Sequence, residues 1–348
     1  METLVFDSYS DFADHALVTI RQDQASGLKA IIAVHNENRG PAIGGCRILP
    51  YRSTEDAVRD VLRLSRGMTY KTAIADILYG GGKAVIIADP QRDKSELLLE
   101  AMGDFVESLA GRYITSFDSG TTLDDIRVIA RRTKHAAGFL PEAGNASGST
   151  ALGVYHCMLA AAEKVNGSAT LAGLKVAIQG VGNVGERLAK LLARDGVQLI
   201  LADTDPARAE ALASAIGAKV VNSDAILQEP CDILSPCALG GILSSETIPK
   251  LGARAVVGGA NNQLARPEDD VRLADRGILY CPDYLANAGG IIDLHYQRSH
   301  WDLAAVERHV ASLGETFRQV IERAEKERRP TAEIADRIAE ERFGRNLR

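Results

Sequence analysis

Two lysines, Lys71 and Lys83, have the residue type and the surroundings needed for acid–base chemistry. Lys71 follows the segment 67–70, while Lys83 follows three glycines and leads directly into the apolar run 84–88. Such a run is typical of a buried strand. Desolvation at the mouth of a buried strand lowers the pKa of a lysine towards the range in which it acts as a base. We therefore predict that Lys83 stands in a glycine turn at a strand mouth and is a candidate general base.

The same stretch allows two other interpretations. Lysines are mostly solvent-exposed, so a surface lysine after a flexible turn remains open on these flanks alone. A phosphate-binding P-loop is excluded, because that motif needs glycine where Ile77 stands and serine or threonine where Ala84 stands.

A carboxylate, Asp118, is the third candidate for chemistry. It follows a short predicted strand over 113–115 and precedes Thr122, which forms a capping box with Asp125 and opens a helix to about Lys134. A strand end just before a helix is a common place for a functional carboxylate. A turn or capping role for Asp118 stays open on this segment alone.

Several elements of the first half must position these residues. A strand is predicted over 28–34, and amphipathic helices begin at Ser53 and at Ser95. The segment 39–47 is predicted as a glycine-rich bend that exposes backbone N–H groups to an anion, with a plain loop as the alternative. The small, polar, glycine-rich segment 141–149 is predicted as a hinge between two domains, and an alanine-rich helix follows it.

The second half alternates strands and helices as a dinucleotide-binding sheet does. A predicted strand over 174–179 is followed at once by Gly180, Gly182 and Gly185 in the pattern G-x-G-x-x-G, and then by a helix over 186–194. In this pattern the glycines serve the tight turn, the approach of a pyrophosphate and close helix–strand packing, in that order. The N-terminus of the helix then faces the phosphates.

Asp203 ends the next predicted strand, about 20 residues beyond the first glycine, as a dinucleotide fold requires. A carboxylate there binds the ribose 2′-hydroxyl and repels a 2′-phosphate, so NAD is favoured over NADP. A glycine turn without a ligand is the competing interpretation. The remaining predicted elements are strands over 232–236, 253–258 and 277–281, whose loops reach the same carboxyl edge, and helices over 303–326 and 332–342.

Composition excludes several other classes of protein. The chain has 348 residues, 46% hydrophobic and 25% charged, with a net charge of −6. Without a basic stripe, nucleic acid is not an expected partner. The five cysteines are unevenly spaced, with apolar flanks, and predict reduced thiols in the cytoplasm. We find no pattern typical of a metal site, a signal peptide or a membrane-spanning helix.

Taken together and in order, the motifs of this chain resemble those of the Glu/Leu/Phe/Val amino-acid dehydrogenase family, and within it the leucine, phenylalanine and tryptophan dehydrogenases. The segments that carry the resemblance are GPAIGG (40–45), RGMTYK (66–71), GGGK (80–83), Asp118 with the following GTT, GVGNVG (180–185), PCALGG (236–241), GANNQL (259–264) and NAGG (287–290). They span nearly the whole chain.

The resemblance implies an α/β fold of two domains with a cleft between them. Residues 1–140 would form a substrate-binding and oligomerisation domain with a mixed sheet, and 141–329 an NAD-binding Rossmann domain. The C-terminal helix, 330–348, would pack back on the first domain. The implied activity is reversible NAD-dependent oxidative deamination of an L-amino acid to a 2-oxo acid and ammonia, by a homo-oligomer.

The resemblance also assigns roles to individual residues. Lys83 would activate water, Asp118 would handle the substrate amino group, and Lys71 with a backbone N–H near Gly44 would bind the carboxylate. Other substrate contacts would be Ile43, Ser116, Asn287, Ile291 and Leu294. Contacts to NAD would be Thr150, Gly180, Gly182, Asn183, Val184, Gly185, Asp203, Cys237, Ala238 and Asn261.

The implied side-chain pocket has three branched aliphatic walls, Ile43, Ile291 and Leu294, which favour leucine or another branched-chain substrate. Phenylalanine or tryptophan is the alternative, because Phe117 and Ser119 depart from the residues that relatives usually carry around Asp118. A non-catalytic NAD-binding regulator on the same fold is a third possibility. It does not account for the joint presence of the two lysines, the aspartate and the asparagines.

Overall fold

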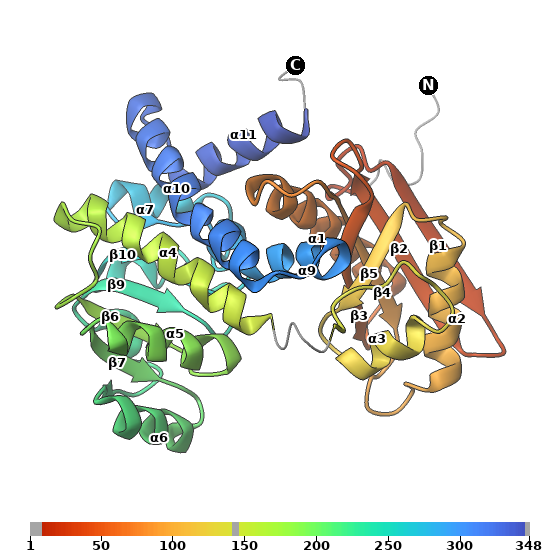
Figure 1. The fold of residues 1–348 in the computed structure, drawn as a ribbon, viewed down its shortest axis with the longest axis horizontal. Coiled ribbons are helices and arrows are strands. Elements are labelled where there is room, and N and C mark those ends of the chain that lie inside the picture. The colour runs from red at the N-terminus through yellow and green to blue at the C-terminus, as the bar shows by residue number, and fades with distance from the viewer. Residues whose placement is uncertain (1–8, 141–145, 345–348) are drawn as a thin grey trace. The chain divides into compact units, whose positions relative to one another are not determined.

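The computed structural model describes residues 9–140 and 146–344, which belong to two compact units (Figure 1). The first unit is Met1–Gly144 with Gln297–His300 and Ala339–Arg348, and the second is Asn145–Tyr296 with Trp301–Ile338. One unit holds a mixed sheet and the other a parallel sheet, so the predicted fold class is confirmed.

The sheet of the first unit has five strands in the order β1-β2-β4-β3-β5. Strand β1 pairs antiparallel with β2 and β2 with β4, whereas β3 runs parallel to both β4 and β5. This places β4 and β3, which carry the glycine-rich motifs, in the interior of the sheet. The strands are β1 (Leu17–Asp23), β2 (Leu28–Asn36), β3 (Ala42–Leu49), β4 (Gly80–Ile87) and β5 (Tyr113–Phe117).

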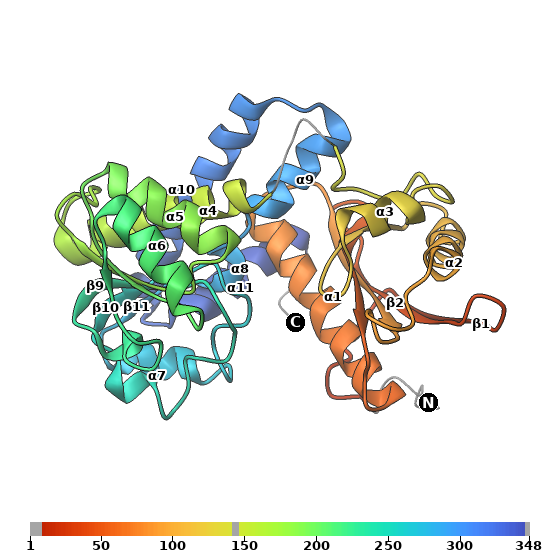
Figure 2. The same cartoon turned by 90° about the horizontal axis from the view of Figure 1, so that it is seen from below.

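Helices cover both faces of this sheet (Figure 2). Helix α1 (Thr54–Ile74) packs against Ile31, Ala33 and Val85 on one face, and α2 (Glu96–Glu107) and α3 (Leu123–Ile129) cover the other. The alternation of buried side chains along β2 and β4 supplies both faces. Each fully buried aliphatic side chain contributes roughly 1.5–3 kcal/mol. The predicted capping box of Thr122 and Asp125 is present at the start of α3.

Two glycine-rich segments that the sequence predicts as a turn and a bend are strands. Residues 80–82 are the first three of β4, and most of the predicted bend lies in β3. Here glycine is required by crowding. A Cβ on Gly81 would lie 2.0 Å from the backbone N of Thr69 in α1, and one on Gly44 would lie 1.8 Å from the carbonyl O of Gly82. The predictions were wrong because glycine also permits close packing of backbones.

Other boundaries also differ from expectation. Helix α1 continues beyond its predicted amphipathic stretch and includes Lys71 in its last turn. Helix α3 ends at Ile129, short of the predicted Lys134. Of the predicted hinge, 141–145 lies outside the described residues, while 147–149 already belong to the next helix.

The sheet of the second unit has six parallel strands in the order β11-β10-β9-β6-β7-β8. Numbered from β6, this is the doubly wound order 3-2-1-4-5-6 of dinucleotide-binding folds. The strands are β6 (Lys175–Gln179), β7 (Gln198–Ala202), β8 (Lys219–Val220), β9 (Cys231–Pro236), β10 (Ala253–Val256) and β11 (Leu279–Tyr280).

Helices link and flank these strands (Figure 1). Helix α5 begins at Asn183, three residues before its predicted start, so that it opens directly on Gly182. The helices are α4 (Ser147–Asn166), α5 (Asn183–Arg194), α6 (Pro206–Ile216), α7 (Asp269–Asp275), α8 (Asp283–Ala286), α9 (Gly289–Ser299), α10 (Leu303–Glu327) and α11 (Thr331–Phe343).

The end of α11 belongs to the first unit, where it contacts α1. Tyr70 donates a hydrogen bond to Glu340 at 2.6 Å, and its ring packs edge-on against Phe343. The guanidinium of Arg342 donates to the carbonyl O of Ala73 and of Ile74. These contacts satisfy carbonyls in the last turn of α1, close to Lys71.

Candidate active site and dinucleotide site

The strand registers place the candidate catalytic residues on one face of the first sheet. Ile43 pairs with Gly81, and Gly45 pairs with Ser116. Side chains two residues apart along a strand share a face, so Ile43, Ser116, Lys83 and Asp118 all project to the same side. That side is covered by α1, whose half-buried Lys71 lies near the helix end. The structure therefore brings Lys83 and Asp118 onto one face and places Lys71 in the helix that covers this face.

Lys83 and Asp118 form a buried ion pair. Lys83 is 5% exposed, and its Nζ donates to Oδ2 of Asp118. Arg47 Nε donates to the other oxygen, Oδ1, at 2.8 Å, and the backbone N–H of Ser119 donates to Oδ1 at 2.7 Å. A lysine this deeply buried is costly unless it is paired, and the carboxylate supplies the pairing.

These partners fix the charge of Asp118. Burial opposes its ionisation, but the positive charges of Lys83 and Arg47 and the hydrogen bonds from both outweigh that cost and lower its pKa from 3.8 to about 2. Asp118 is therefore an anion at neutral and alkaline pH. In this arrangement the carboxylate orients and neutralises cations, which suits contact with a substrate ammonium group.

Gly45 and Arg47 are residues of this site that our sequence reasoning missed. A Cβ on Gly45 would lie 2.7 Å from the Cβ of Asp118, so only glycine leaves room for the carboxylate. Their signal in the sequence is the run Gly-Gly-Cys-Arg at 44–47. We predicted that run as part of a glycine-rich bend and gave its arginine no role, although it stands two residues after a glycine that the site needs.

The predicted pocket walls are buried, each within its own unit. In the first unit Ile43 is fully buried, and Ser116 is 2% exposed with no partner for its Oγ among the described residues. In the second unit Ile291 is buried and Leu294 half-buried, both on α9. A buried hydroxyl without a partner is uncommon and marks a place where a ligand or water is bound.

The glycine loop after β6 has the geometry of a phosphate cradle. Gly180 has φ of +90°, and a Cβ on Gly185 would lie 2.0 Å from the carbonyl O of Gly180. A Cβ on Gly182, by contrast, would meet nothing within 4 Å, so this glycine faces open space. Asn183 and Val184 follow in the first turn of α5, whose N-terminal amides point to that space.

Asp203 lies at the end of β7, beside this loop. Its Oδ2 accepts from the backbone N–H of Val181 at 2.8 Å and its Oδ1 from that of Asp205 at 2.9 Å. Burial opposes ionisation, but these two hydrogen bonds and the charge of Arg208 lower its pKa. Arg208 Nη1 lies 3.9 Å from Asp203 and lines a cavity of about 300 Å³ together with Val181. Sequence reasoning also missed Arg208.

The remaining predicted cofactor residues converge within the second unit. A Cβ on Gly180 would lie 2.6 Å from that of Ala238, which follows Cys237 after β9. Asn287 Nδ2 donates to Asn261 Oδ1 at 2.8 Å, while Asn287 Oδ1 is buried without a hydrogen-bond partner among the described residues. Thr150 lies close by, because a Cβ on Gly290 would be 3.0 Å from its Oγ1.

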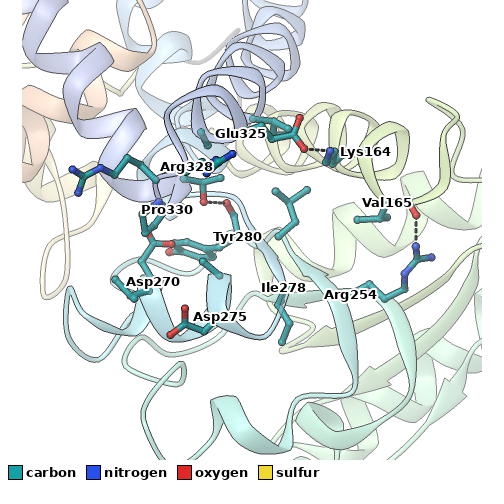
Figure 3. Close-up of a pocket in the computed structure, with 18 residues that line it drawn as sticks. Lys164, Val165, Arg254, Asp270, Asp275, Ile278, Tyr280, Glu325, Arg328 and Pro330 are labelled. Atoms are coloured by element: carbon teal, nitrogen blue, oxygen red, sulfur yellow. Dashed lines mark hydrogen bonds and ion pairs between the residues drawn. The ribbon is translucent and has the colours of Figure 1, made fainter.

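A larger cavity, of about 610 Å³, lies elsewhere in the second unit and shares no residue with these loops (Figure 3). It is lined at the starts of β10 and β11 by residues such as Arg254 and Ile278. Two of its charged groups are partnered: Lys164 is directed at Glu325, and Arg254 donates to the carbonyl O of Val165 (Figure 3). The carboxyl edge, where dinucleotides bind, is the opposite edge of the sheet.

The residues at the carboxyl edge fit NAD. Gly182 leaves space for a pyrophosphate, and Asp203 offers acceptors for ribose hydroxyls. Within residues 9–140 and 146–344, no cluster of His, Cys, Asp and Glu is arranged to hold a metal ion, and no helix has the length and apolarity to cross a membrane. Fold and site together define a dinucleotide-dependent oxidoreductase.

Comparison with known proteins identifies the family. The model of the Glu/Leu/Phe/Val dehydrogenase dimerisation domain matches residues 14–135, and that of Glutamate/Leucine/Phenylalanine/Valine dehydrogenase matches 144–206 and 201–345. The chain belongs to this family and is an NAD-dependent amino-acid dehydrogenase.

Individual relatives act on different amino acids. The chain is 43% identical to leucine dehydrogenase of Geobacillus stearothermophilus, covering 96% of this chain and 92% of the relative. It is 45% identical to valine dehydrogenase of Streptomyces virginiae, covering 96% and 95%. The crystal structure of L-tryptophan dehydrogenase from Nostoc punctiforme matches with a TM-score of 0.86 and 43% identity, covering 95% and 96%. Overall identity therefore does not separate aliphatic from aromatic substrates.

Replacing Gly45 by alanine tests the crowding around Asp118. The new Cβ has to displace the carboxylate, so kcat/KM for amino-acid oxidation should fall roughly a hundredfold while the fold persists. The matched control is Gly67→Ala, because a Cβ on Gly67 would meet nothing within 4 Å. Wild-type kinetics for Gly45→Ala would contradict this account of the site.

Replacing Asp203 by alanine tests cofactor selection. We expect the wild type to prefer NAD strongly, because the carboxylate repels a 2′-phosphate by an energy on the order of a kcal/mol. In Asp203→Ala the ratio of kcat/KM with NAD to kcat/KM with NADP should become smaller, because Arg208 remains to attract the 2′-phosphate. Glu210→Ala, which removes an exposed carboxylate of α6, should leave the preference unchanged. Equal kcat/KM with NAD and NADP in the wild type would refute the role of Asp203.

Proposed function

We propose that the protein oxidatively deaminates an L-amino acid with an apolar side chain, leucine or another branched-chain amino acid being favoured, to the 2-oxo acid and ammonia. The observation that carries the proposal is the buried pair of Lys83 and Asp118 on the face of the first sheet that α1 covers. A cation and an anion held in fixed positions suit a reaction that moves protons at an amino group.

In the first unit, four groups act on the substrate in this proposal. Lys71 binds the substrate carboxylate, helped by the backbone N–H of Gly44. Lys83 Nζ, in its neutral amine form, takes a proton from the water that attacks the imino carbon and becomes the ammonium that pairs with Asp118. Asp118, an anion in the free enzyme, accepts hydrogen bonds from the substrate amino group and compensates the positive charge of its ammonium form. Release of ammonia then leaves the 2-oxo acid.

In the second unit the proposed roles concern the cofactor and one end of the substrate. NAD, when bound, supplies the acceptor for the substrate hydride. Thr150 and Asn261 lie at the nicotinamide end and Asn287 near the substrate, while Asp203 holds the adenosine ribose. The other contacts to NAD are assigned to Gly180, Gly182, Asn183, Val184, Gly185, Cys237 and Ala238, and of these Gly182 lets the pyrophosphate approach. Exclusion of water from these groups strengthens their electrostatic effect.

We also propose a function for each part of the chain. Residues 1–140 would bind substrate and form a homo-oligomer, 141–329 would bind NAD, and 330–348 would support the first domain. This is supported by the grouping of Ala339–Arg348 with the first unit and by the match of 14–135 to a family model described as a dimerisation domain.

We also propose that the protein is located in the cytoplasm. This location is supported by the five cysteines, all of them free thiols.

The proposed preference for aliphatic side chains rests on the walls of the pocket. The resemblance assigns Ile43, Ile291 and Leu294 to the substrate side chain, and all three are branched and of medium to large size. A buried methylene is worth roughly 1 kcal/mol, so discrimination among leucine, isoleucine and valine should be mild. No cation is present among these walls, which disfavours glutamate.

An aromatic substrate is the second candidate, and specific observations favour it. Ser116 is a small wall residue with an unpartnered hydroxyl, and the neighbouring Phe117 is 40% exposed. The L-tryptophan dehydrogenase structure also matches this chain over nearly its full length. Ser116 is therefore the first position that would make room for a ring.

A panel of L-amino acids decides between the two candidates. NADH formation at alkaline pH should give the highest kcat/KM with leucine, isoleucine or valine, with phenylalanine and tryptophan lower and glutamate inactive. A tenfold or greater advantage for an aromatic amino acid would exclude the aliphatic preference (roughly 1.4 kcal/mol of transition-state binding). Absence of oxidation with every amino acid would refute the proposed function itself.

A further inference from the structure

Arg47 connects Asp118 to a second carboxylate and has no assigned role in the reaction. It lies in β3, two residues after Gly45 and on the same face of the sheet. Its Nε donates to Asp118 Oδ1 at 2.8 Å and its Nη1 to Asp60 Oδ2 at 3.0 Å. One guanidinium therefore bridges the candidate site and α1, the helix that covers this face.

Asp60 accepts hydrogen bonds from two side chains, Arg47 and Tyr51. The hydroxyl of Tyr51 donates to Asp60 Oδ2 at 2.5 Å, the same oxygen that accepts from Arg47. All of these side chains are half-buried, with 22% exposure for Arg47 and 28% for Asp60. Positive and negative side chains therefore alternate from the interior of the sheet to helix α1, in the order Lys83, Asp118, Arg47 and Asp60. A planar guanidinium can meet both carboxylates at once, which an ammonium cannot do with the same geometry.

We propose that Arg47 is a positioning residue for the reaction: it holds Oδ1 of Asp118 so that Oδ2 faces Lys83, and Asp60 and Tyr51 hold Arg47 in that orientation. This inference rests on the proposed function of Lys83 and Asp118. Arg47 acts through the carboxylate and is not assigned any contact with substrate. A purely structural ion pair between β3 and α1 is the competing explanation, and the two differ in their consequences.

The electrostatics of the site agree with this geometry. The charged and titratable groups that interact with Asp118 are Lys83 from β4, Arg47 and the buried thiol of Cys46 from β3, the buried Tyr113 from β5, and, further out, Asp60 and Tyr51. Lys83 and Arg47 both favour the anion, whereas burial opposes it. Removing Arg47 leaves burial opposed by Lys83 and the backbone N–H of Ser119, without the second positive charge, so the pKa of the Asp118 carboxyl rises.

Kinetics of Arg47→Met and Arg47→Lys test the positioning role, with the best amino-acid substrate and NAD. Arg47→Met should lower kcat roughly a hundredfold with a much smaller change in KM, because the carboxylate is displaced but the carboxylate-binding Lys71 is not. Arg47→Lys should recover part of the loss, since it keeps the charge but not the bridge. The matched control is Arg132→Met, which breaks an exposed two-pronged arginine–carboxylate pair with Asp104 in the same unit.

A double-mutant cycle tests the contribution of Asp60. Asp60→Asn alone should reduce kcat in the same direction but by less, and Asp60→Asn added to Arg47→Met should cost little more than Arg47→Met alone. Full additivity of the two effects, or a kcat for Arg47→Met equal to that of Arg132→Met, would overturn the proposal.

A titration without turnover separates this proposal from the proposed function. The carboxyl carbon of Asp118 is followed by ¹³C NMR and assigned by its loss in Asp118→Asn. Its titration midpoint should rise in Arg47→Met and rise less in Arg47→Lys, with Arg132→Met unchanged. An unmoved midpoint in both Arg47 variants would overturn the role of Arg47 even in an active enzyme. If the wild type oxidises no amino acid, the proposed function fails, while the midpoint still decides whether Arg47 holds Asp118.

Discussion

The first unit depends on one constraint, which is the burial of a lysine charge at the centre of a sheet. Lys83 is 5% exposed in β4, and such a charge persists only beside a compensating anion. Asp118 reaches it from the end of β5, and the absence of a side chain at Gly45 leaves space for the carboxylate of Asp118. The glycines of β4 let α1 approach the sheet closely, which brings Lys71 to the same face. Packing and chemistry therefore require the same residues.

The second unit has a different requirement, which is to bind a dianionic pyrophosphate with few positively charged side chains. In the proposed function, the backbone amides at the start of α5 bind the pyrophosphate, next to the open space at Gly182. Asp203 is held by two backbone N–H groups from the loops around it, so the loop geometry and the cofactor preference are coupled. The guanidinium of Arg208 lies 3.9 Å from Asp203, so Asp203 is not the only charged group at this end of the site.

What the sequence predicts well is local. The dinucleotide loop was found because its glycines, the strand before them and the helix after them are adjacent in the chain. The glycines before Lys83 were assigned to a turn because the atoms that require them, in Thr69 and across β3, are not neighbours in sequence. Arg47 was missed for the same reason, since its partner Asp118 lies 71 residues away. The resemblance supplied the roles of single residues, whereas only the structure gives their distances and burial.

The most direct test of this account is the oxidation of the preferred amino acid by Lys83→Ala, compared with Lys94→Ala. Lys94 also pairs with a carboxylate of the same unit, Asp125, but outside the site. The account predicts that Lys83→Ala folds and binds NADH like the wild type but loses deamination by several orders of magnitude, while Lys94→Ala keeps it. Turnover near the wild-type rate in a folded Lys83→Ala variant would contradict the central claim.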